Sequence, residues 1–271
     1  MRRHARSVPE LLEVEIYRRL AARTLGRPIV GVDAPDAWFL KGGLTEAQVT
    51  VALVGRSIVA DRRTGKLLLL DLSDDPRHSS ATLGLRFGMT GRLLVDGGPM
   101  EKLTYGSNRD VPAWDRFSLR FAGGGELRVR DPRRLGGIEL DPDEARLGVD
   151  ATALTAAALG GVLRGSEAPV KARLMDQARI AGLGNLLTDE SLWRAGVDPA
   201  RRAGSLTPAD VRRLHHHLRT TLDVLGRRGG SHLGDLMAAR VRGGVCPRDA
   251  TPLLRRTVAG RTTYSCPRHQ R

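Results

Sequence analysis

The chain is predicted to be an α+β protein of two domains, and three observations support this. An amphipathic segment comes first, short strand-like segments follow up to about residue 140, and helical periodicity then takes over. Runs of strands followed by runs of helices are typical of α+β folds. With 271 residues, 41% of them apolar, the chain is long enough to build two cores. We expect an N-terminal β-sandwich preceded by an α-helix, then a helical domain that ends in a zinc-ribbon-like hairpin.

Residues 9–23 form the first predicted helix. Pro9 suits the first helical position, and the acidic residues after it suit the first turn. The helical spacing predicts a buried face made of Leu11, Val14, Ile16, Tyr17 and Leu20.

Short apolar or alternating segments broken by Gly, Asp and Pro fill residues 28–140. The strand candidates include 58–60, 67–72, 83–87, 117–121 and 127–130. Strands at this spacing favour a sandwich or a barrel. The segment 141–144 is predicted to be a boundary, which gives domains at 8–142, 143–240 and 241–271. Helices are expected at 170–176, 184–195, 207–225 and 232–239.

The charge balance indicates a polyanionic partner. Lys and Arg outnumber Asp and Glu by 44 to 30, a formal net charge of +14. This predicts DNA, RNA or an acidic membrane surface, and the alternative is a merely solvated basic surface. No segment approaches the ~20 apolar residues of a membrane span, and the N-terminus lacks the apolar region of a secretion signal. We therefore expect no membrane partner and a reducing cytoplasm.

The C-terminal residues have metal-ligand spacing. Cys246 and Asp249 form one short motif, and Cys266 and His269 repeat its spacing after a hairpin-length insert. All four residue types bind zinc, which predicts a zinc-ribbon site, although a carboxylate is unusual in a structural zinc site. The alternative is a metal-free hairpin that keeps the ribbon shape by packing.

Two further segments are candidate sites for chemistry. A free N-terminal proline is a secondary amine that condenses with an aldehyde carbon, and a neighbouring acid such as Glu10 can move the proton. The Pro9 nitrogen is an amide while residues 1–8 remain attached, and the alternative is an ordinary helix start. Residues 180–190 form a Gly-rich turn that enters a helix, where backbone amides and Asn185 can bind phosphate. Any helix–helix turn can have the same composition.

Six segments in register resemble the formamidopyrimidine-DNA glycosylase / endonuclease VIII family of bifunctional base-excision repair enzymes. They are similar to the family's N-terminal signature, strand lysine motif, two DNA-intercalation loops, helix–two-turn–helix and zinc-finger hairpin. In this chain they are residues 9–15, 63–66, 87–91, 131–136, 176–190 and 260–269. The resemblance implies a DNA glycosylase with AP lyase activity on damaged double-stranded DNA.

The resemblance also implies roles for individual residues. Pro9 is the expected nucleophile and Glu10 the general acid/base, with Glu13 supporting them. Lys66 and Arg261 complete the catalytic group by gripping the phosphates that flank the everted nucleotide. Further expected DNA contacts, on phosphates or within the duplex, are Asn185, Lys171, Met89, Arg133 and Leu135.

A base inside a duplex is inaccessible, so the family flips it out, and Met89 is expected to fill the vacated space. Arg133 is expected to pair with the orphaned base. Leu135 stands where the family usually has an aromatic wedge, and a smaller wedge stacks less well. Without the resemblance, Met89 would be assigned to the core and Arg133 to the surface.

Two departures from the family pattern matter. Val8 stands at the family's initiator-methionine position, so we expect translation to start at codon 8 and methionine removal to free Pro9. Only ten residues separate Asp235 from Cys246, where oxidised-purine enzymes have a longer loop. This favours an endonuclease VIII-like or broader lesion range over strict 8-oxoguanine specificity.

We therefore predict a monomeric, nucleoid-associated bacterial enzyme of the cytoplasm with bound Zn²⁺. One competing hypothesis is a catalytically silent binder of DNA damage or abasic sites. A general basic nucleic-acid-binding module is the other, and it would bind damaged and undamaged duplex equally.

Overall fold

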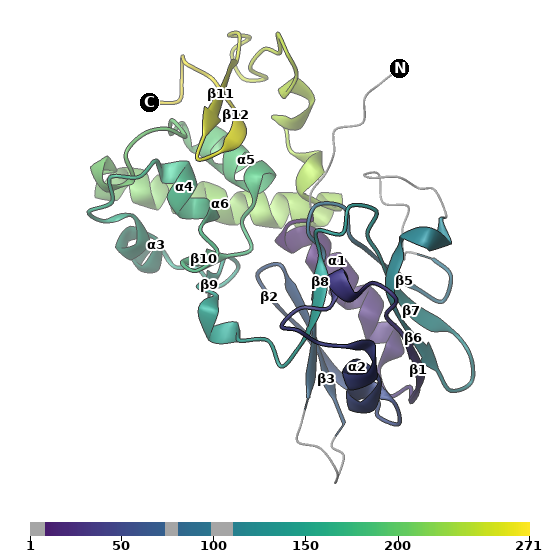
Figure 1. The fold of residues 1–271 in the computed structure, drawn as a ribbon. Coiled ribbons are helices and arrows are strands. Elements are labelled where there is room, and N and C mark those ends of the chain that lie inside the picture. The colour runs from purple at the N-terminus through teal and green to yellow at the C-terminus, as the bar shows by residue number, and fades with distance from the viewer. Residues whose placement is uncertain (1–8, 74–80, 99–110) are drawn as a thin grey trace. The chain divides into compact units, whose positions relative to one another are not determined.

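The computed structural model describes residues 9–73, 81–98 and 111–271. The chain divides into two compact units, and each is described here by itself (Figure 1). One unit contains Pro9 and residues 13–144, and the other contains residues 10–12 and 145–271. Residues 1–7 and Val8, at which the first predicted domain begins, lie outside the described residues. The predicted domain boundaries stay predictions.

The first unit is an antiparallel β-sandwich of two four-stranded sheets, in the orders β2-β3-β4-β8 and β1-β6-β7-β5 (Figure 1). This confirms the predicted sandwich. The strands are β1 Ile29–Asp33, β2 Ile58–Thr64, β3 Leu67–Leu72, β4 Thr82–Arg86, β5 Arg92–Val95, β6 Asp115–Phe121, β7 Glu126–Arg130 and β8 Gly137–Leu140. The leading helix is α1, Leu11–Ala21.

The core of this unit lies between the sheets and beside α1. Alternate residues of β3, such as Leu68 and Leu70, are completely buried in it, as the two-residue period of a strand requires. Burying such a side chain contributes about 1.5–3 kcal/mol. From α1, Tyr17 packs its ring 4.5 Å from that of Phe87. Its hydroxyl donates to the carbonyl of Gly91 at 3.2 Å, so the helix is fastened to the loop after β4.

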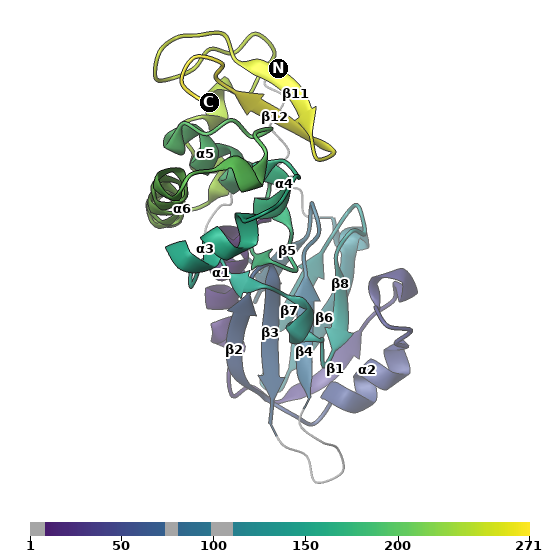
Figure 2. The ribbon, with the colours of Figure 1, turned by 90° about the vertical axis from the view of Figure 1, so that its left-hand side faces the viewer.

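One helix falls where only strands were expected. Helix α2, Glu46–Leu53, begins at a capping box in which Thr45 and Gln48 satisfy each other's backbone N–H groups. Its Val49 and Leu53, four residues apart, are completely buried, and the helix packs beside β1 (Figure 2). The cap, rather than a broad apolar face, marks this helix in the sequence.

The second unit is helical, with its own apolar core. Its elements are α3 Ala156–Leu163, α4 Val170–Met175, α5 Asn185–Ala195 and α6 Pro208–Arg228, with two-stranded pairs of β9 Val149–Asp150 with β10 Ile180–Ala181 and of β11 Leu254–Val258 with β12 Arg261–Ser265. The β11–β12 hairpin lies beside α5 (Figure 2). No helix in the described ranges is long and apolar enough to cross a membrane.

The helix expected over residues 232–239 is wrong. The structure has two short 3₁₀ turns there, Ser231–Leu233 and Met237–Ala239, separated by the extended Gly234. The carboxylate of Glu190 accepts the backbone N–H groups of Asp235 and Leu236, both at 3.0 Å. These N–H groups are therefore used by a residue of α5, so the segment folds as turns.

Candidate functional site

The carboxylate of Glu10 is the most tightly held acid of the predicted site. It is completely buried and accepts three backbone N–H groups at the start of α5. The donors are Gly184 at 2.9 Å, Leu186 at 2.7 Å and Leu187 at 3.1 Å. These are the N–H groups that a helix start leaves without intrahelical partners. An ideal Cβ on Gly184 would lie 2.3 Å from the Glu10 carboxyl carbon, so only glycine admits this approach. The neighbouring Pro9 is also buried, and so is Glu13 in the first turn of α1.

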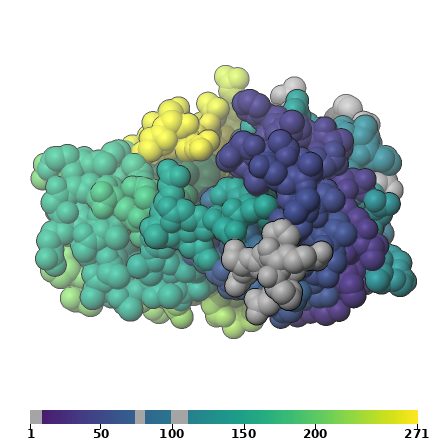
Figure 3. All heavy atoms as spheres, turned by 60° about the horizontal axis from the view of Figure 1, so that its bottom comes forward, coloured from purple at the N-terminus to yellow at the C-terminus, as the bar shows by residue number. Residues whose placement is uncertain are grey.

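The start of α5 is also fastened to the hairpin. The side-chain amide of Asn185 donates to the carbonyl of Thr262 at 3.2 Å. Arg261, the residue before it, begins β12 with its side chain exposed. The hairpin (yellow) reaches the surface of the molecule in Figure 3. Asn185 and Arg261 are both predicted to contact phosphates, and this hydrogen bond joins Asn185 to the residue that follows Arg261.

Lys171 lies in a buried charged cluster. It is completely buried, and its ammonium donates to the Asp189 carboxylate at 2.6 Å and the Thr263 hydroxyl at 2.7 Å. Arg240 also pairs with Asp189. Burial lowers the pKa of Lys171, and the Asp189 carboxylate opposes that shift. Lys171 was predicted as a phosphate contact, but in this structure its ammonium is bonded within the protein.

Two loops of the sandwich unit come together around one buried acid. The carboxylate of Asp131 accepts the backbone N–H groups of Leu135 and Gly136 at 2.8 Å and of Arg133 at 3.1 Å. It also accepts the hydroxyl of Thr90, in the loop after β4. The strands β4 and β8 are paired, which brings the ends of the two loops side by side. Asp131 therefore fixes the backbone that presents the predicted wedge.

The predicted DNA-contacting side chains stand at the tips of these loops. Arg133 is exposed, Leu135 is 49% exposed, and Met89 is half-buried. Lys66 is also half-buried, in the tight turn between β2 and β3 where Gly65 has a φ of +59°. The exposure of Arg133 and Leu135 leaves both side chains accessible to another molecule.

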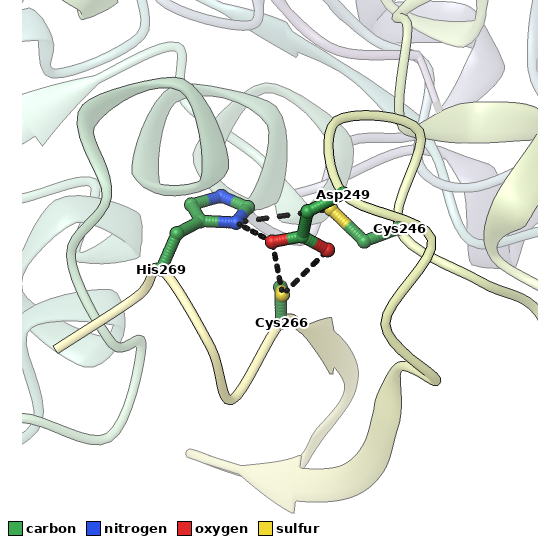
Figure 4. A group of neighbouring side chains, drawn as sticks. All are labelled: Cys246, Asp249, Cys266 and His269. Carbon is green, nitrogen blue, oxygen red and sulfur yellow. Dashed lines mark hydrogen bonds and ion pairs between the residues drawn. The ribbon is translucent and has the colours of Figure 1, made fainter.

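The four predicted metal ligands gather at one point. Cys246, Asp249, Cys266 and His269 place their ligand atoms within 4.8 Å of one another (Figure 4). The His269 Nδ1 lies 3.1 Å from the Asp249 carboxylate and 3.8 Å from the Cys246 sulfur. Tetrahedral zinc with bonds of about 2.0–2.3 Å separates its donor atoms by about 3.3–3.8 Å. The donor set therefore fits a tetrahedral metal ion.

Groups behind these ligands orient them. The indole N–H of Trp193 donates to the Cys246 sulfur at 3.3 Å, and His269 Nε2 lies 3.2 Å from the carbonyl of Trp193. A metal-binding histidine ordinarily donates its second ring nitrogen in this way. The backbone N–H of Thr251 holds the pKa of Asp249 well below its usual range, while burial raises the pKa of the Cys266 thiol.

The sequence did not reveal the residues that hold the predicted site in place. Asp131, Asp189 and Thr263 lie inside the recognised segments, and the side-chain partners of Asp189 and Thr263 are distant in sequence. The signal available for Asp131 was its place before Pro132 in a turn, where a short acid commonly accepts backbone N–H groups.

Comparison with known proteins identifies the family. Residues 8–138 match the formamidopyrimidine-DNA glycosylase N-terminal domain, and residues 147–234 match the formamidopyrimidine-DNA glycosylase H2TH domain. The chain belongs to the formamidopyrimidine-DNA glycosylase family.

Individual relatives agree with this assignment. The chain is 35% identical to the formamidopyrimidine-DNA glycosylase of Paracoccus denitrificans, covering 96% of this chain and 99% of the relative. That of Chloroflexus aggregans is 34% identical, over 96% and 98%. The solved structure of the Lactococcus lactis Fpg with abasic-site DNA superposes with a TM-score of 0.81, at 25% identity over 97% and 100% of the two chains.

Members of the formamidopyrimidine-DNA glycosylase family are base-excision repair DNA glycosylases with AP lyase activity. Family membership confirms the predicted class of enzyme and the predicted fold, with its helix–two-turn–helix domain. The second matched segment lies within the helical unit, which also contains residues 10–12 and 235–271, and the first lies mostly in the sandwich unit.

Proposed function

We propose that this chain removes an oxidised base from double-stranded DNA and cuts the strand through a Schiff base on Pro9. The Pro9 nitrogen attacks the anomeric carbon of the deoxyribose as the damaged base leaves. The resulting iminium acidifies the neighbouring sugar proton, and β-elimination then breaks the bond to the 3′ phosphate. A second, δ-elimination can follow.

The observation that supports this reaction most directly is the way Glu10 is held. A carboxylate bonded to three backbone N–H groups has a fixed position, and it follows Pro9 directly in the chain. Proton transfer requires such a fixed acid/base next to the nucleophile. Ring opening of the sugar and removal of its proton both fall to Glu10, with Glu13 in support.

Six further residues are proposed to contact DNA. Lys66 and Arg261 supply positive charge, and Asn185 an amide, to the phosphates around the everted nucleotide. Met89, Arg133 and Leu135 fill and read the space that the base leaves. We assign Lys171 a positioning role instead of a direct phosphate contact, because its ammonium holds Thr263 beside Arg261.

The lesion range is proposed to be broad or endonuclease VIII-like, because the segment between Asp235 and Cys246 is short. We further propose that the enzyme works as a monomer on the bacterial nucleoid in the cytoplasm. A silent damage binder is the competing function, and it is distinguished by the fate of the Pro9 nitrogen.

The hairpin ligands are proposed to hold Zn²⁺, which would fix the turn at Cys246 and Asp249 against β12. Elemental analysis of purified protein tests this, with one zinc per chain as the expected result. Cys266→Ser should remove the metal and lower the thermal midpoint of unfolding. A metal-free, fully folded wild-type protein would contradict the assignment.

The reaction is tested with a form that begins at Pro9, checked by intact mass. This form, incubated with abasic-site duplex and borohydride, should give a covalent protein–DNA adduct because borohydride reduces the iminium. Pro9→Gly replaces the secondary amine of proline by a primary amine, and in a form that retains residues 1–8 the Pro9 nitrogen is an amide. We expect the borohydride adduct to be absent from both proteins.

An adduct from the form that retains residues 1–8 would refute the role of Pro9. A folded Pro9 form that binds the duplex without forming an adduct would favour the silent binder. Duplexes carrying oxidised purines and oxidised pyrimidines, compared in single turnover, then measure the lesion range.

A further inference from the structure

We propose that Trp38 is a further DNA-contacting residue, which packs its indole against the duplex beside the wedge loop. This inference rests on the proposed function, since it needs DNA at residues 131–136. No residue of the sequence analysis pointed to residues 36–41. The observation behind it is a large aromatic side chain that is 68% exposed.

Trp38 is rigidly presented. It lies in the 3₁₀ turn Ala37–Phe39, which begins at Asp36, and its backbone N–H donates to the Asp36 carboxylate at 3.1 Å. Phe39, the next residue, is completely buried and anchors the turn in the core. The ammonium of Lys41 donates to the Trp38 carbonyl at 2.8 Å and lies 5.5 Å from the centre of the indole ring. The indole is thus held at the surface by its own turn.

The turn is fastened to the wedge loop within the sandwich unit. Asp36 pairs with Arg134, with a distance of 2.6 Å between the Arg134 Nε and the Asp36 carboxylate. This pairing, with burial opposing it, holds the pKa of Asp36 below its usual range. The backbone N–H of Lys41 donates to the carbonyl of Ile138 at 2.9 Å. The turn that carries Trp38 is therefore joined to the wedge loop at the residue next to Leu135.

The charges around Trp38 favour a polyanion. In the two segments 36–41 and 131–136, the acids Asp36 and Asp131 are buried and turned to backbone or arginine partners. The bases Arg133 and Arg134 are exposed, and Lys41 is partly exposed. Proteins hold nucleic acid by stacking and charge where an exposed aromatic ring stands beside basic groups, as Trp38 does beside Lys41.

Trp38 also complements the small side chain of the wedge residue, Leu135. Leu135 presents no aromatic face to a base step, whereas the exposed indole on the adjoining turn does. Aromatic side chains stack on any base or pack on a sugar, so the contact adds affinity without sequence preference. Trp38 would then supply part of the stacking area that the wedge loop itself lacks.

The experiment uses the fluorescence of Trp38 in the form that begins at Pro9. The chain has three tryptophans, Trp38, Trp114 and Trp193. Trp114 and Trp193 are present in both wild type and Trp38→Phe, so the difference between the two fluorescence signals isolates Trp38. A duplex with a central tetrahydrofuran abasic analogue is titrated into both proteins, with and without acrylamide. We expect the duplex to quench the difference signal and to protect it from acrylamide.

Affinity provides the second readout. Trp38→Ala should raise the Kd for this duplex about tenfold, and Trp38→Phe less, because phenylalanine keeps a stacking face. Val51→Ala, which truncates an exposed apolar residue of α2 in the same unit, should leave the Kd unchanged. Thermal unfolding of each variant checks that the fold is intact.

An unchanged difference signal together with an unchanged Kd of Trp38→Ala, while wild type binds and forms the borohydride adduct, would overturn this inference alone. If wild type neither binds the duplex nor forms an adduct, the proposed function fails and the inference falls with it.

Discussion

Two groups of candidate side chains, one inside the helical unit and one at the loop tips of the sandwich unit, are held in opposite ways. In the helical unit, Glu10, Lys171 and Asp189 are buried completely or almost so, and each is bonded to groups of the same unit. In the sandwich unit, Arg133 and Leu135 are exposed at a loop tip, and only the backbone beneath them is held.

This difference separates two tasks. A buried charge has lost its hydration, so its partners must all be in place, and the group stays fixed for proton transfer. An exposed side chain on an anchored loop keeps its hydration until a ligand arrives, so it contributes to binding and little to folding. Changes at Glu10, Lys171 and Asp189 should therefore affect chemistry and stability, and changes at the loop tips of the sandwich unit should affect DNA affinity.

The largest expected effect is on the Glu10 carboxylate. Glu10→Gln removes the charge and turns an amide toward three N–H donors, so single-turnover base release should fall about 10²- to 10⁴-fold. Duplex affinity should change little. Glu46→Gln is the matched control, because Glu46 also accepts a backbone N–H group, from Ala34 at 2.8 Å. An equal loss of the base-release rate in the two variants would show that the buried Glu10 contributes no more to the reaction than Glu46 does.

The next effect concerns the buried charged cluster. Lys171→Met leaves Asp189 buried with Arg240 as its remaining charged partner, and should lower the free energy of unfolding by about 3–5 kcal/mol. Adding Asp189→Leu should not recover the loss, because it leaves the almost buried Arg240 without its carboxylate partner. Urea unfolding followed by circular dichroism measures both. A loss below about 1 kcal/mol in the single variant would show that the cluster is not a stability determinant.

A smaller effect is expected at the loop anchor. Asp131→Ala removes the acceptor of three backbone N–H groups and should lower the free energy of unfolding by about 2–3 kcal/mol and also weaken duplex binding. Arg133→Ala should weaken binding alone, with an unchanged unfolding midpoint. If Arg133→Ala lowers the free energy of unfolding as much as Asp131→Ala does, the exposed side chain of Arg133 contributes to stability and the contrast with Asp131 fails.

The smallest effect is expected at a partly exposed helix cap. Burial acts to raise the pKa of Asp210, but hydrogen bonds from Thr207 and Arg213 outweigh it and lower the pKa to about 2. Its stabilising contribution is therefore present above the ordinary value of 3.8 and is lost as the pH falls through about 2. Asp210→Asn should cost about 1 kcal/mol at pH 7, after allowance for solvent screening, and almost nothing near pH 2. Chemical unfolding at both pH values checks this, and a difference that does not depend on pH would exclude the carboxylate as the cause.

Local signals in the sequence predicted much of the fold. A short apolar run located β3 and helical periodicity located α5, and the spacing at Cys246 and Cys266 predicted the four ligands that the structure gathers at one point. Helix α2 was missed because its apolar face is narrow, and its strongest signal is the cap at Thr45. The helix expected over 232–239 fails because Glu190, more than forty residues earlier, takes the N–H groups that it needs.

The buried contacts of Lys171 could not be predicted from local sequence either, because its partners are distant along the chain. Nothing adjacent to Lys171 indicates that its ammonium meets Thr263, 92 residues later. The phosphate contact predicted for Lys171 came from the resemblance to the family, and basic residues are ordinarily found at the surface. The exposed Trp38 was equally hidden, because a tryptophan between apolar neighbours is expected to be buried.

The assignment of Glu10–Leu12 to the helical unit has a consequence for recombination between relatives. A chimera joined at residue 145 would take these three residues from the parent that supplies the sandwich, and the three amides at the start of α5 would then depend on a foreign acid. The two units are therefore not interchangeable modules at their sequence boundary. An exchange that keeps these hydrogen bonds has to take residues 10–12 and residues 145–271 from the same parent.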